Sequence, residues 1–476
     1  MFEDENEEDW LTPDFRKQLA HFEQMYDRKD YSYIDSDHIE FILDHLIALN
    51  QIKKARWAAE KALEHFPTNS TILIRYAQVL SFSGDINRAL KILLELEQVE
   101  VNNVEVLLSI ANCYSQFRKP KSAIKYYKRA FDLSSGDEKI DIAIDLAMEY
   151  ENSEEYHLAI EVLKEAKKKG TPNDLLVFEM AHCYEKLSDY DNAVKAYLEY
   201  IDEEPYSYTT WYNLGNTYAK QDKFNEAIWA YEYAVIINDS FVPAFYNLAN
   251  TYLDSNQVKK ALEYFQLCLE LDQEDPLVYC SIGECYEELE EIEKAYEMFD
   301  KSTELLPQFG EAWLGKGIMS NHLGFHQRAI RELMLAVELE PINGEYWNAL
   351  GNAYESANQD DLALNAYQKS TEYSPDTKEF MIDYLTALSN VSADLFFDYI
   401  EKNKKVTNNN VIKLVLVYVS WMMGEKLNSF LYFNELLEEE ITLAKNIFYY
   451  FPELEDELYF TEKLKEVDKN NRNEKF

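Results

Sequence analysis

The sequence predicts an all-α protein built from stacked antiparallel helix pairs, and three observations lead to that prediction. Only 12 glycines and 11 prolines occur among 476 residues, well below the roughly 7% and 5% of average usage, which argues against turn-rich β folds and collagen-like repeats. Apolar residues make up 47% of the chain, enough for a large core, which excludes wholesale disorder. Short sequence patterns return with a period of 34 residues, the signature of a repeat architecture.

The period is clearest where the stretch from Trp211 to Tyr218 returns, 136 residues or four periods later, from Trp347 to Tyr354. Ten full repeats start at residues 36, 70, 104, 140, 174, 208, 242, 276, 310 and 344. One interval is 36 residues, because Ser134 to Asp137 is expected to lengthen a loop. The predicted organisation is an acidic tip and capping helix in 1–35, ten repeats in 36–377, and degenerate repeats with a C-terminal cap in 378–476.

Each repeat is predicted to contain two helices joined by a short turn. The fourth, seventh, eighth and eleventh residues lie on one face of the first helix, and the twentieth, twenty-fourth and twenty-seventh on one face of the second. The eighth residue is small in nine of ten repeats, the twentieth is alanine in all ten, and the eleventh and twenty-fourth are usually aromatic. Large rings are therefore expected to fill the space beside small residues. Proline stands at the thirty-second position in five repeats, where it stops the second helix: Pro67, Pro205, Pro307, Pro341 and Pro375.

The two ends depart from the regular pattern, as the capping repeats of a solenoid do. Pro13 to Tyr26 predicts a capping helix behind the acidic tip. Residues 378–407 resemble a shortened repeat and residues 408–441 a degenerate one. A further helix pair is expected from Leu443 to about Leu464, with a frayed end from Lys469 to Phe476.

This pattern resembles the tetratricopeptide repeat family over residues 36–377. The repeat at 344 carries the family signature in Trp347, Leu350, Gly351, Tyr354, Ala363, Tyr367 and Pro375. The repeat at 310 departs from it at Lys316, Ser320 and Leu333. The resemblance implies a right-handed superhelical solenoid, called a TPR array, whose first helices line a concave groove that binds protein.

Charge excludes several classes of partner. The chain has 46 basic and 88 acidic residues, so 46 − 88 gives a formal charge of −42. Nucleic acid is not an expected partner, because binding to phosphates depends on Lys and Arg, and anionic membranes are disfavoured for the same reason. Six acids from Glu3 to Asp9 stand where an export signal would be basic and then apolar. The apolar stretch Val411 to Met423 is too short to insert into a membrane, so a cytoplasmic protein is expected.

No pattern in the sequence predicts catalysis, a cofactor or a metal site. The five cysteines are an odd number and do not make a disulfide framework. Cys113, Cys183 and Cys285 share the tenth position of a first helix, which predicts small packing residues. The eight histidines show no metal signature, and no phosphate-binding loop occurs. The sequence therefore predicts a protein that is not an enzyme.

Asparagines at the sixth and ninth positions of first helices are the main candidates for binding. In the family the first helices line the groove, so the resemblance implies that these amides point into it, where each offers a donor and an acceptor to an extended peptide. The alternative is that the amides only support packing between helices. Tyrosines at the fifth position would add aromatic contacts. The candidates are Asn213, Asn216, Asn247, Asn250, Asn352, Tyr212 and Tyr246, with Asn112 at an equivalent position.

Glu284 and Glu287, at the ninth and twelfth positions of their repeat, should also face the groove. Residues 276–309 hold nine acids and two lysines, a net charge of −7. Such a groove favours a protein or peptide partner with a basic segment and speeds its encounter. The alternative is that the acids only keep the surface soluble. Family co-chaperones clamp a C-terminal carboxylate with lysines at the second or fifth position, and from residue 208 to residue 348 those positions hold none.

The function predicted from the sequence is a non-enzymatic scaffold or adaptor that holds an extended, basic polypeptide segment in the groove. Two other functions remain open. The aromatic C-terminal repeats could form a homo-oligomer interface, or the chain could be the regulatory subunit of a separately encoded enzyme. The rings considered for self-assembly are Trp421, Phe430, Phe433, Phe448, Tyr449 and Tyr450.

Overall fold

The computed structural model describes residues 13–168, 171, 173–272, 274–403 and 409–473, and all regular secondary structure in these residues is helical. The predicted all-α fold class is thereby confirmed. The acids from Glu3 to Asp9 lie outside the described residues. By its internal contacts the chain divides into two compact parts, 1–244 and 245–476. They are called here the N-terminal and C-terminal halves, and each is described by itself.

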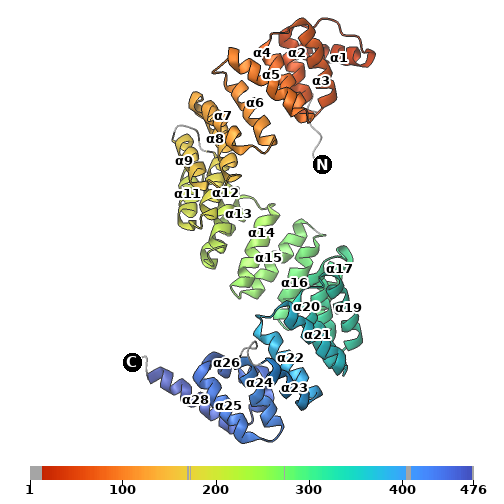
Figure 1. Ribbon diagram of the computed structural model, residues 1–476, viewed down its shortest axis with the longest axis vertical. Helices are drawn as coiled ribbons and strands as arrows, with labels where there is room; N and C mark the ends of the chain where they lie inside the picture. Colours follow the sequence, from red (N-terminus) through yellow and green to blue (C-terminus); the bar gives the residue numbers. More distant parts are fainter. Residues whose placement is uncertain (1–12, 169–170, 172, 273, 404–408, 474–476) are drawn as a thin grey trace. The chain divides into compact units, whose positions relative to one another are not determined.

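The ten repeats each contain one first helix and one second helix (Figure 1). The first helices are α2 (Ser36–Ala48), α4 (Ser70–Phe82), α6 (Val104–Gln116), α8 (Gly136–Glu151), α10 (Asp174–Lys186), α12 (Tyr208–Ala219), α14 (Val242–Asp254), α16 (Pro276–Glu288), α18 (Gly310–His322) and α20 (Gly344–Ser356). The second helices are α3 (Ile52–His65), α5 (Ile86–Val99), α7 (Pro120–Leu133), α9 (Tyr156–Lys167), α11 (Tyr190–Glu203), α13 (Phe224–Ile237), α15 (Val258–Leu271), α17 (Ile292–Leu305), α19 (His326–Leu339) and α21 (Asp360–Tyr373).

The residue before a repeat explains where the first helix begins. In seven repeats its side chain accepts a hydrogen bond from a backbone N–H of the first turn, which satisfies a donor that the helix leaves unpaired. These capping residues are Asp35, Asn69, Asn103, Asn173, Ser207, Asp275 and Asn343.

The two extra residues near 136 were expected to lengthen a loop, but they extend a helix instead. Helix α8 begins at Gly136, four residues before the predicted repeat start at 140. Asp137 and Glu138 then lie in the first turn, where acidic side chains stabilise the positive end of the helix dipole. The connection from α7 is reduced to Ser134 and Ser135.

The turn inside every repeat reverses the chain in the same way. Its fifteenth residue has a positive φ, between +53° and +83°, in all ten repeats, the left-handed conformation that ends many helices. Only two of the ten are glycines, Gly84 and Gly324, although glycine alone adopts this conformation without a steric cost. The other eight are Asn50, Arg118, Glu154, Ser188, Asp222, Asn256, Glu290 and Asn358.

The two helices of a repeat pack where the sequence has its small residues. The twentieth residue, alanine throughout, is at most 2% exposed in all ten repeats. At the eighth position, a Cβ added to Gly215 would lie 2.5 Å from the ring of Tyr231, the twenty-fourth residue of the same repeat. Gly283 and Gly351 meet Phe299 and Tyr367 in the same way. The predicted match of small residues with large rings is therefore confirmed.

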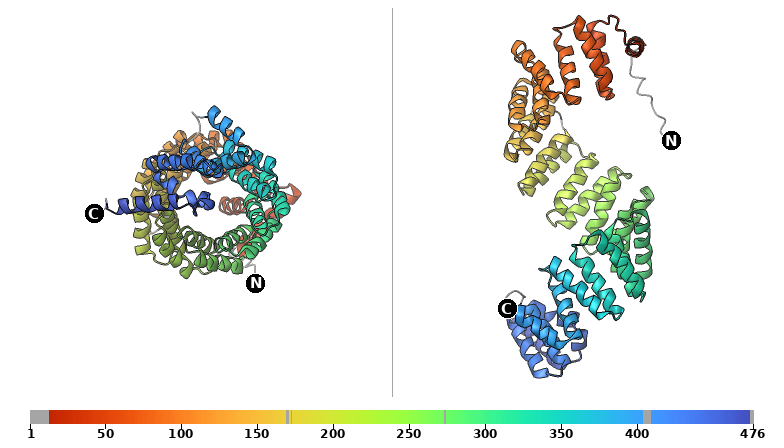
Figure 2. Two further views of the ribbon diagram at one scale, coloured as in Figure 1. Left: turned by 90° about the horizontal axis from the view of Figure 1, so that it is seen from below. Right: turned by 45° about the vertical axis from the view of Figure 1, so that its right-hand side comes forward.

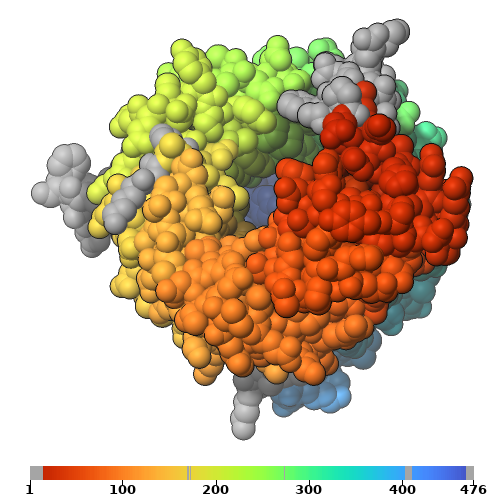
Figure 3. Space-filling model, turned by 90° about the horizontal axis from the view of Figure 1, so that it is seen from above, coloured from red at the N-terminus to blue at the C-terminus, as the bar shows by residue number. Residues whose placement is uncertain are grey.

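Successive repeats are joined mainly by the second helix of one repeat packing on the first helix of the next, and neighbouring first helices also contact one another. Within the N-terminal half α4 contacts α6 and α10 contacts α12, and within the C-terminal half α18 contacts both α16 and α20. The right-hand view of Figure 2 shows the helix pairs following one another in sequence order, and Figure 3 shows the red and orange repeats of the N-terminal half in continuous contact on one face. The first helices therefore form one layer in each half, whose exposed side chains are candidates for binding.

The irregular repeat at 310 replaces apolar contacts with buried polar ones. The ammonium group of Lys316, buried in α18, lies 2.6 Å from Asp300 and 3.2 Å from Thr303 Oγ1. Ser320 donates a 2.5 Å hydrogen bond to the buried Glu332. These partners satisfy the polar groups, as a buried site requires.

The C-terminal end is more irregular than expected. Helices α22 (Lys378–Val391) and α23 (Ala393–Asn403), then α24 (Asn409–Met422) and α25 (Lys426–Glu439), form two pairs. The expected pair from 443 to about 464 is instead made of short helices α26 (Ile441–Lys445) and α27 (Ile447–Tyr450), a 3₁₀ turn Pro452–Leu454, and α28 (Leu458–Asn473). Lys469 to Asn473, expected to fray, continue α28. At the front, α1 (Pro13–Arg28) begins at the predicted residue.

Candidate protein-interaction surface

The ninth-position asparagines form hydrogen bonds inside their own repeats. The Tyr231 hydroxyl donates to the side-chain oxygen of Asn216 at 2.7 Å, and Tyr367 donates to Asn352 at the same distance. Tyr127 donates to Asn112 in the same way. These bonds satisfy the buried hydroxyls of the twenty-fourth residues, which favours the supporting role for the ninth-position amides.

The sixth-position asparagines are placed differently. Asn213 is half-buried on α12, and its side-chain amide forms no hydrogen bond with any residue that the structure describes. Only its backbone carbonyl is engaged, by the Thr217 hydroxyl at 3.0 Å. Asn247 on α14 is likewise half-buried, and its carbonyl accepts from Thr251 at 2.7 Å. Asn250 is the ninth residue of that repeat, whose twenty-fourth residue is Phe265, a side chain without a hydroxyl to donate.

The two candidate tyrosines are half-buried among other rings. Tyr212 lies 5.2 Å from Phe241 and 5.9 Å from Tyr231, measured between ring centroids. Tyr246 lies 5.6 Å from Phe265. Part of each ring therefore supports packing, and the remaining part is accessible to a partner.

An acidic hollow in the C-terminal half brings Glu284 and Glu287 together with two further glutamates. Its volume is about 370 Å³, and it lies between α16, α18 and the start of α20. Glu311 and Glu345 add their carboxyl groups, and the floor is apolar. No basic residue is among those that line the hollow, which are Glu284, Glu287, Phe299, Glu311, Leu314, Gly315, Ile318, Asn343, Glu345 and Tyr346.

Two of these carboxyl groups, those of Glu284 and Glu287, have a raised pKa. Glu284 keeps contact with solvent, but desolvation of its carboxyl group by the surrounding residues, and after it the charges of Glu311 and Glu287, raise its pKa from 4.5 to about 7. Burial and the charge of Glu288 also raise the pKa of Glu287. A raised pKa means that the charged form of the carboxyl group is disfavoured there, and a cationic group entering the hollow would stabilise that charged form.

Glu311 and Glu345 were missed as site residues, although a signal for them exists. Each is the second residue of its repeat, one of the positions at which the family's carboxylate clamps carry lysine. In the sequence alone, position two shows only that the lysine of such a clamp is missing. The structure places acids there beside Glu284, so the charge is opposite to that of a clamp.

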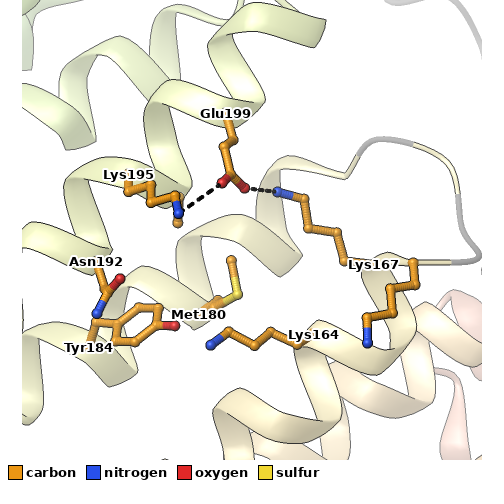
Figure 4. A pocket seen from close by; sticks show the side chains of 9 residues that line it. Lys164, Lys167, Met180, Tyr184, Asn192, Lys195 and Glu199 are labelled. Atoms are coloured by element: carbon orange, nitrogen blue, oxygen red, sulfur yellow. Dashed lines mark hydrogen bonds and ion pairs between the residues drawn. The ribbon is translucent and has the colours of Figure 1, made fainter.

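A second hollow, in the N-terminal half, carries lysines (Figure 4). It has a volume of about 420 Å³ and lies over α9, α10 and α11. Glu199 forms ion pairs with Lys167 at 3.1 Å and with Lys195 at 3.9 Å, shown as dashed lines. The Lys164 ammonium lies 5.2 Å from the centre of the Tyr184 ring. Two of the lysines thus share one carboxylate, which compensates one of their two positive charges.

Comparison with protein families decides the identity of the repeat. Models described as tetratricopeptide repeat match residues 104–137, 178–243, 242–275, 277–309 and 344–377. The chain carries tetratricopeptide repeats. The matched segments lie within the helix pairs described above, so the predicted resemblance is confirmed.

Individual tetratricopeptide repeat proteins are similar over limited lengths. Tetratricopeptide repeat protein 8 of Caenorhabditis elegans is 30% identical over 84 residues, which cover 18% of this chain and 17% of that protein. The solved structure of a tetratricopeptide repeat protein from Parabacteroides merdae is 17% identical, with a TM-score of 0.41, over 58% of this chain and 96% of that one. The structure of YrrB, a TPR protein with an unusual peptide-binding site, is 21% identical, with a TM-score of 0.34, over 40% and 97%.

Tetratricopeptide repeats serve in general as scaffolds for protein interaction, and this coarse function applies to the chain. Among the described residues, none of the helices combines the length and apolar character needed to span a membrane. All five cysteines are buried and free, in agreement with the packing role predicted for them.

Proposed function

We propose that the chain is a scaffold that holds an extended polypeptide with a basic segment, and that the acidic hollow between α16, α18 and α20 takes a lysine or arginine side chain. The observation that carries the proposal is the meeting of Glu284, Glu287, Glu311 and Glu345 around one hollow lined by no basic residue. Carboxylates that share a partly desolvated site attract a cation more strongly than carboxylates spread over an open surface.

The composition of the hollow also suits a long cationic side chain. The apolar floor, which includes Phe299, Leu314 and Ile318, would contact the methylene groups of lysine or arginine while the charged end meets the carboxylates. The net charge of −42 would speed the encounter with a basic segment at low salt.

In the N-terminal half, Asn213 would contact the backbone of the same kind of extended segment. Its amide offers two donors and one acceptor, and no described residue uses them. Contacts with the peptide backbone depend little on the partner's side chains, so specificity would come from the acidic hollow. Affinity would come from the sum of several weak contacts.

Fluorescence anisotropy with two labelled peptides of equal length tests the proposal. One peptide alternates glycine with lysine and the other glycine with glutamate. The chain should bind only the first, and the double substitution Glu284→Gln with Glu311→Gln should weaken binding about tenfold, or about 1.4 kcal/mol.

The matched control is Glu304→Gln, which removes an exposed acid from the same repeat outside the hollow. Equal weakening by the control and by the double substitution would mean that overall charge, and not the hollow, binds the peptide.

Self-assembly through the C-terminal repeats is a second candidate, but on different residues from those first considered. Phe433 is fully buried, Phe430 stacks on Tyr459 at 3.9 Å, and of the six rings only Tyr449, 79% exposed, is largely open to solvent. The aliphatic Leu427 and Leu431, one turn apart on α25, are 73% and 53% exposed. Sedimentation of the chain and of Leu427→Lys would separate a dimer from a monomer.

A regulatory subunit role is open as well, and affinity capture with mass spectrometry addresses it.

A further inference from the structure

A group of metal-ligating side chains joins two consecutive repeats in the N-terminal half. Glu151 is the last residue of α8, and Glu179 and His182 lie one turn apart on α10. One ligand atom from each of the three, two carboxylate oxygens and one imidazole nitrogen, lies within 4.8 Å of the others. His182 Nδ1 is 3.0 Å from Glu151 Oε2.

The repeat architecture fixes this arrangement. The twelfth residue of one repeat contacts the tenth residue of the next at several joints, such as Thr217 with Glu185 at 2.6 Å and Cys113 with Ser81 at 3.8 Å. Glu151 and Cys183 make the same contact, in which the thiol donates to Glu151 Oε1 at 3.2 Å. The carboxylate of Glu151 is thereby held against α10, where the sixth and ninth residues are Glu179 and His182.

The charges in this group are not balanced by the protein. Glu179 is only 8% exposed. No lysine or arginine in the described part of the chain forms an ion pair with Glu151 or Glu179. At the next joint, by contrast, Lys220 lies 2.5 Å from Glu185, the counterpart of Glu151. Burial, and after it the charge of Glu151, raise the pKa of Glu179. The carboxylates of Glu151 and Glu179 are therefore close together in a partly buried site without a basic side chain to balance their charge.

We propose that Glu151, Glu179 and His182 bind one zinc ion at the joint between α8 and α10. Carboxylate oxygen and imidazole nitrogen are zinc ligands, with bonds of about 2.0–2.2 Å in a tetrahedral site. Such bonds separate the ligand atoms by roughly 3.3 Å, so side-chain rotation over about an ångström closes the group around the ion. The two carboxylates neutralise the ion, and water occupies the fourth position.

Cys183 supports the site without binding the ion. Its hydrogen bond to Glu151 orients the carboxylate, the role that outer-shell donors have in zinc sites. The His182 side chain, 37% exposed, leaves the ion a path from solvent. The bound ion links the two repeats, because Glu151 belongs to one of them and Glu179 and His182 to the next.

Calorimetric titration of the full chain tests the site. The chain is first freed of metal with a chelator and then titrated with zinc in excess magnesium, which occupies the many surface carboxylates. One zinc ion should bind per chain, and Glu179→Gln and His182→Gln should each weaken binding at least tenfold. Glu185→Gln, at the same register in the next repeat, should bind zinc as the unchanged chain does, and Cys183→Ser should retain binding within a few-fold.

Thermal unfolding gives a second readout. Zinc should raise the unfolding temperature of the chain and of Glu185→Gln, because the ion binds only the folded joint, and should leave that of His182→Gln unchanged. The absence of one-to-one binding, or equal binding by the chain and by both Glu179→Gln and His182→Gln, would overturn the proposal. Cobalt replaces zinc as a spectroscopic probe, and a strong sulfur-to-cobalt band would contradict the role given to Cys183.

Discussion

The Tyr231 hydroxyl donates a 2.7 Å hydrogen bond to the side chain of Asn216, fifteen residues earlier in the same repeat. The ring is 1% exposed, so the bond ties the second helix α13 to the first helix α12 beneath the surface layer. Asn213, one turn before Asn216, makes no such bond in the part of the chain that the structure describes. Neighbouring asparagines of one helix therefore have different roles.

This difference predicts opposite effects for two alanine substitutions. Asn216→Ala should lower the free energy of unfolding by about 1–2 kcal/mol, because it removes the acceptor of a buried hydroxyl. Asn213→Ala should change it by less than about 0.5 kcal/mol and weaken peptide binding. A double-mutant cycle of Asn216→Ala with Tyr231→Phe, measured by urea unfolding, should give a coupling of about 0.5–1.5 kcal/mol. A coupling of zero would contradict the supporting role of Asn216.

The close approach at Gly215 predicts a steric effect. Gly215→Ala places a Cβ 2.5 Å from the Tyr231 ring and should destabilise the chain by about 1–3 kcal/mol, the range of an overpacked core. In a Tyr231→Leu background the same substitution should cost much less, since the ring that it meets is gone. Thermal unfolding of the four chains measures both effects, and an equal cost in both backgrounds would contradict the contact.

The turn residues with positive φ predict stabilising substitutions. Glu154→Gly should raise the free energy of unfolding by about 0.5–1 kcal/mol. The steric cost of the left-handed conformation, about 1–2 kcal/mol, is removed and is partly offset by the greater freedom of glycine in the unfolded chain. Gly84→Ala, at the same register, should act in the opposite direction. Urea unfolding checks both, and a loss of stability in Glu154→Gly would contradict the assigned conformation.

The pKa of Glu284 predicts a dependence on pH. Because its pKa in the folded chain, about 7, lies above the unfolded value of about 4.5, the folded chain holds its proton more tightly. This contribution to stability is complete below about pH 4.5 and is lost as the pH rises to about 7. Binding of a basic peptide should strengthen over the upper part of this range as the carboxyl group ionises. Glu284→Gln should remove both trends, and an unchanged pH profile would contradict the shift.

The sequence predicted the elements that depend on contacts inside one repeat. Ala227 and Gly215 marked the buried faces of the two helices, because small residues recur at their positions with the 34-residue period. A small residue is required at each position by packing inside its own repeat. Contacts between repeats were harder to predict. Glu311 and Glu345 join Glu284 only through the stacking of three repeats, and Glu151 meets His182 across a joint. The helical start at Gly136 was missed because a Ser-Ser-Gly-Asp stretch is equally typical of a loop.

The eight non-glycine turn residues with positive φ have a consequence for how such an array changes over time. Each lies at the junction of the two helices in its own repeat, none lines the acidic hollow, and none belongs to the proposed zinc site. A replacement by glycine at any of them should therefore act on stability without removing a group from the acidic hollow or from the proposed zinc site. Selection for a warmer habitat, or a laboratory screen for thermostable variants, can therefore proceed at these eight places one at a time without a loss of ligand preference.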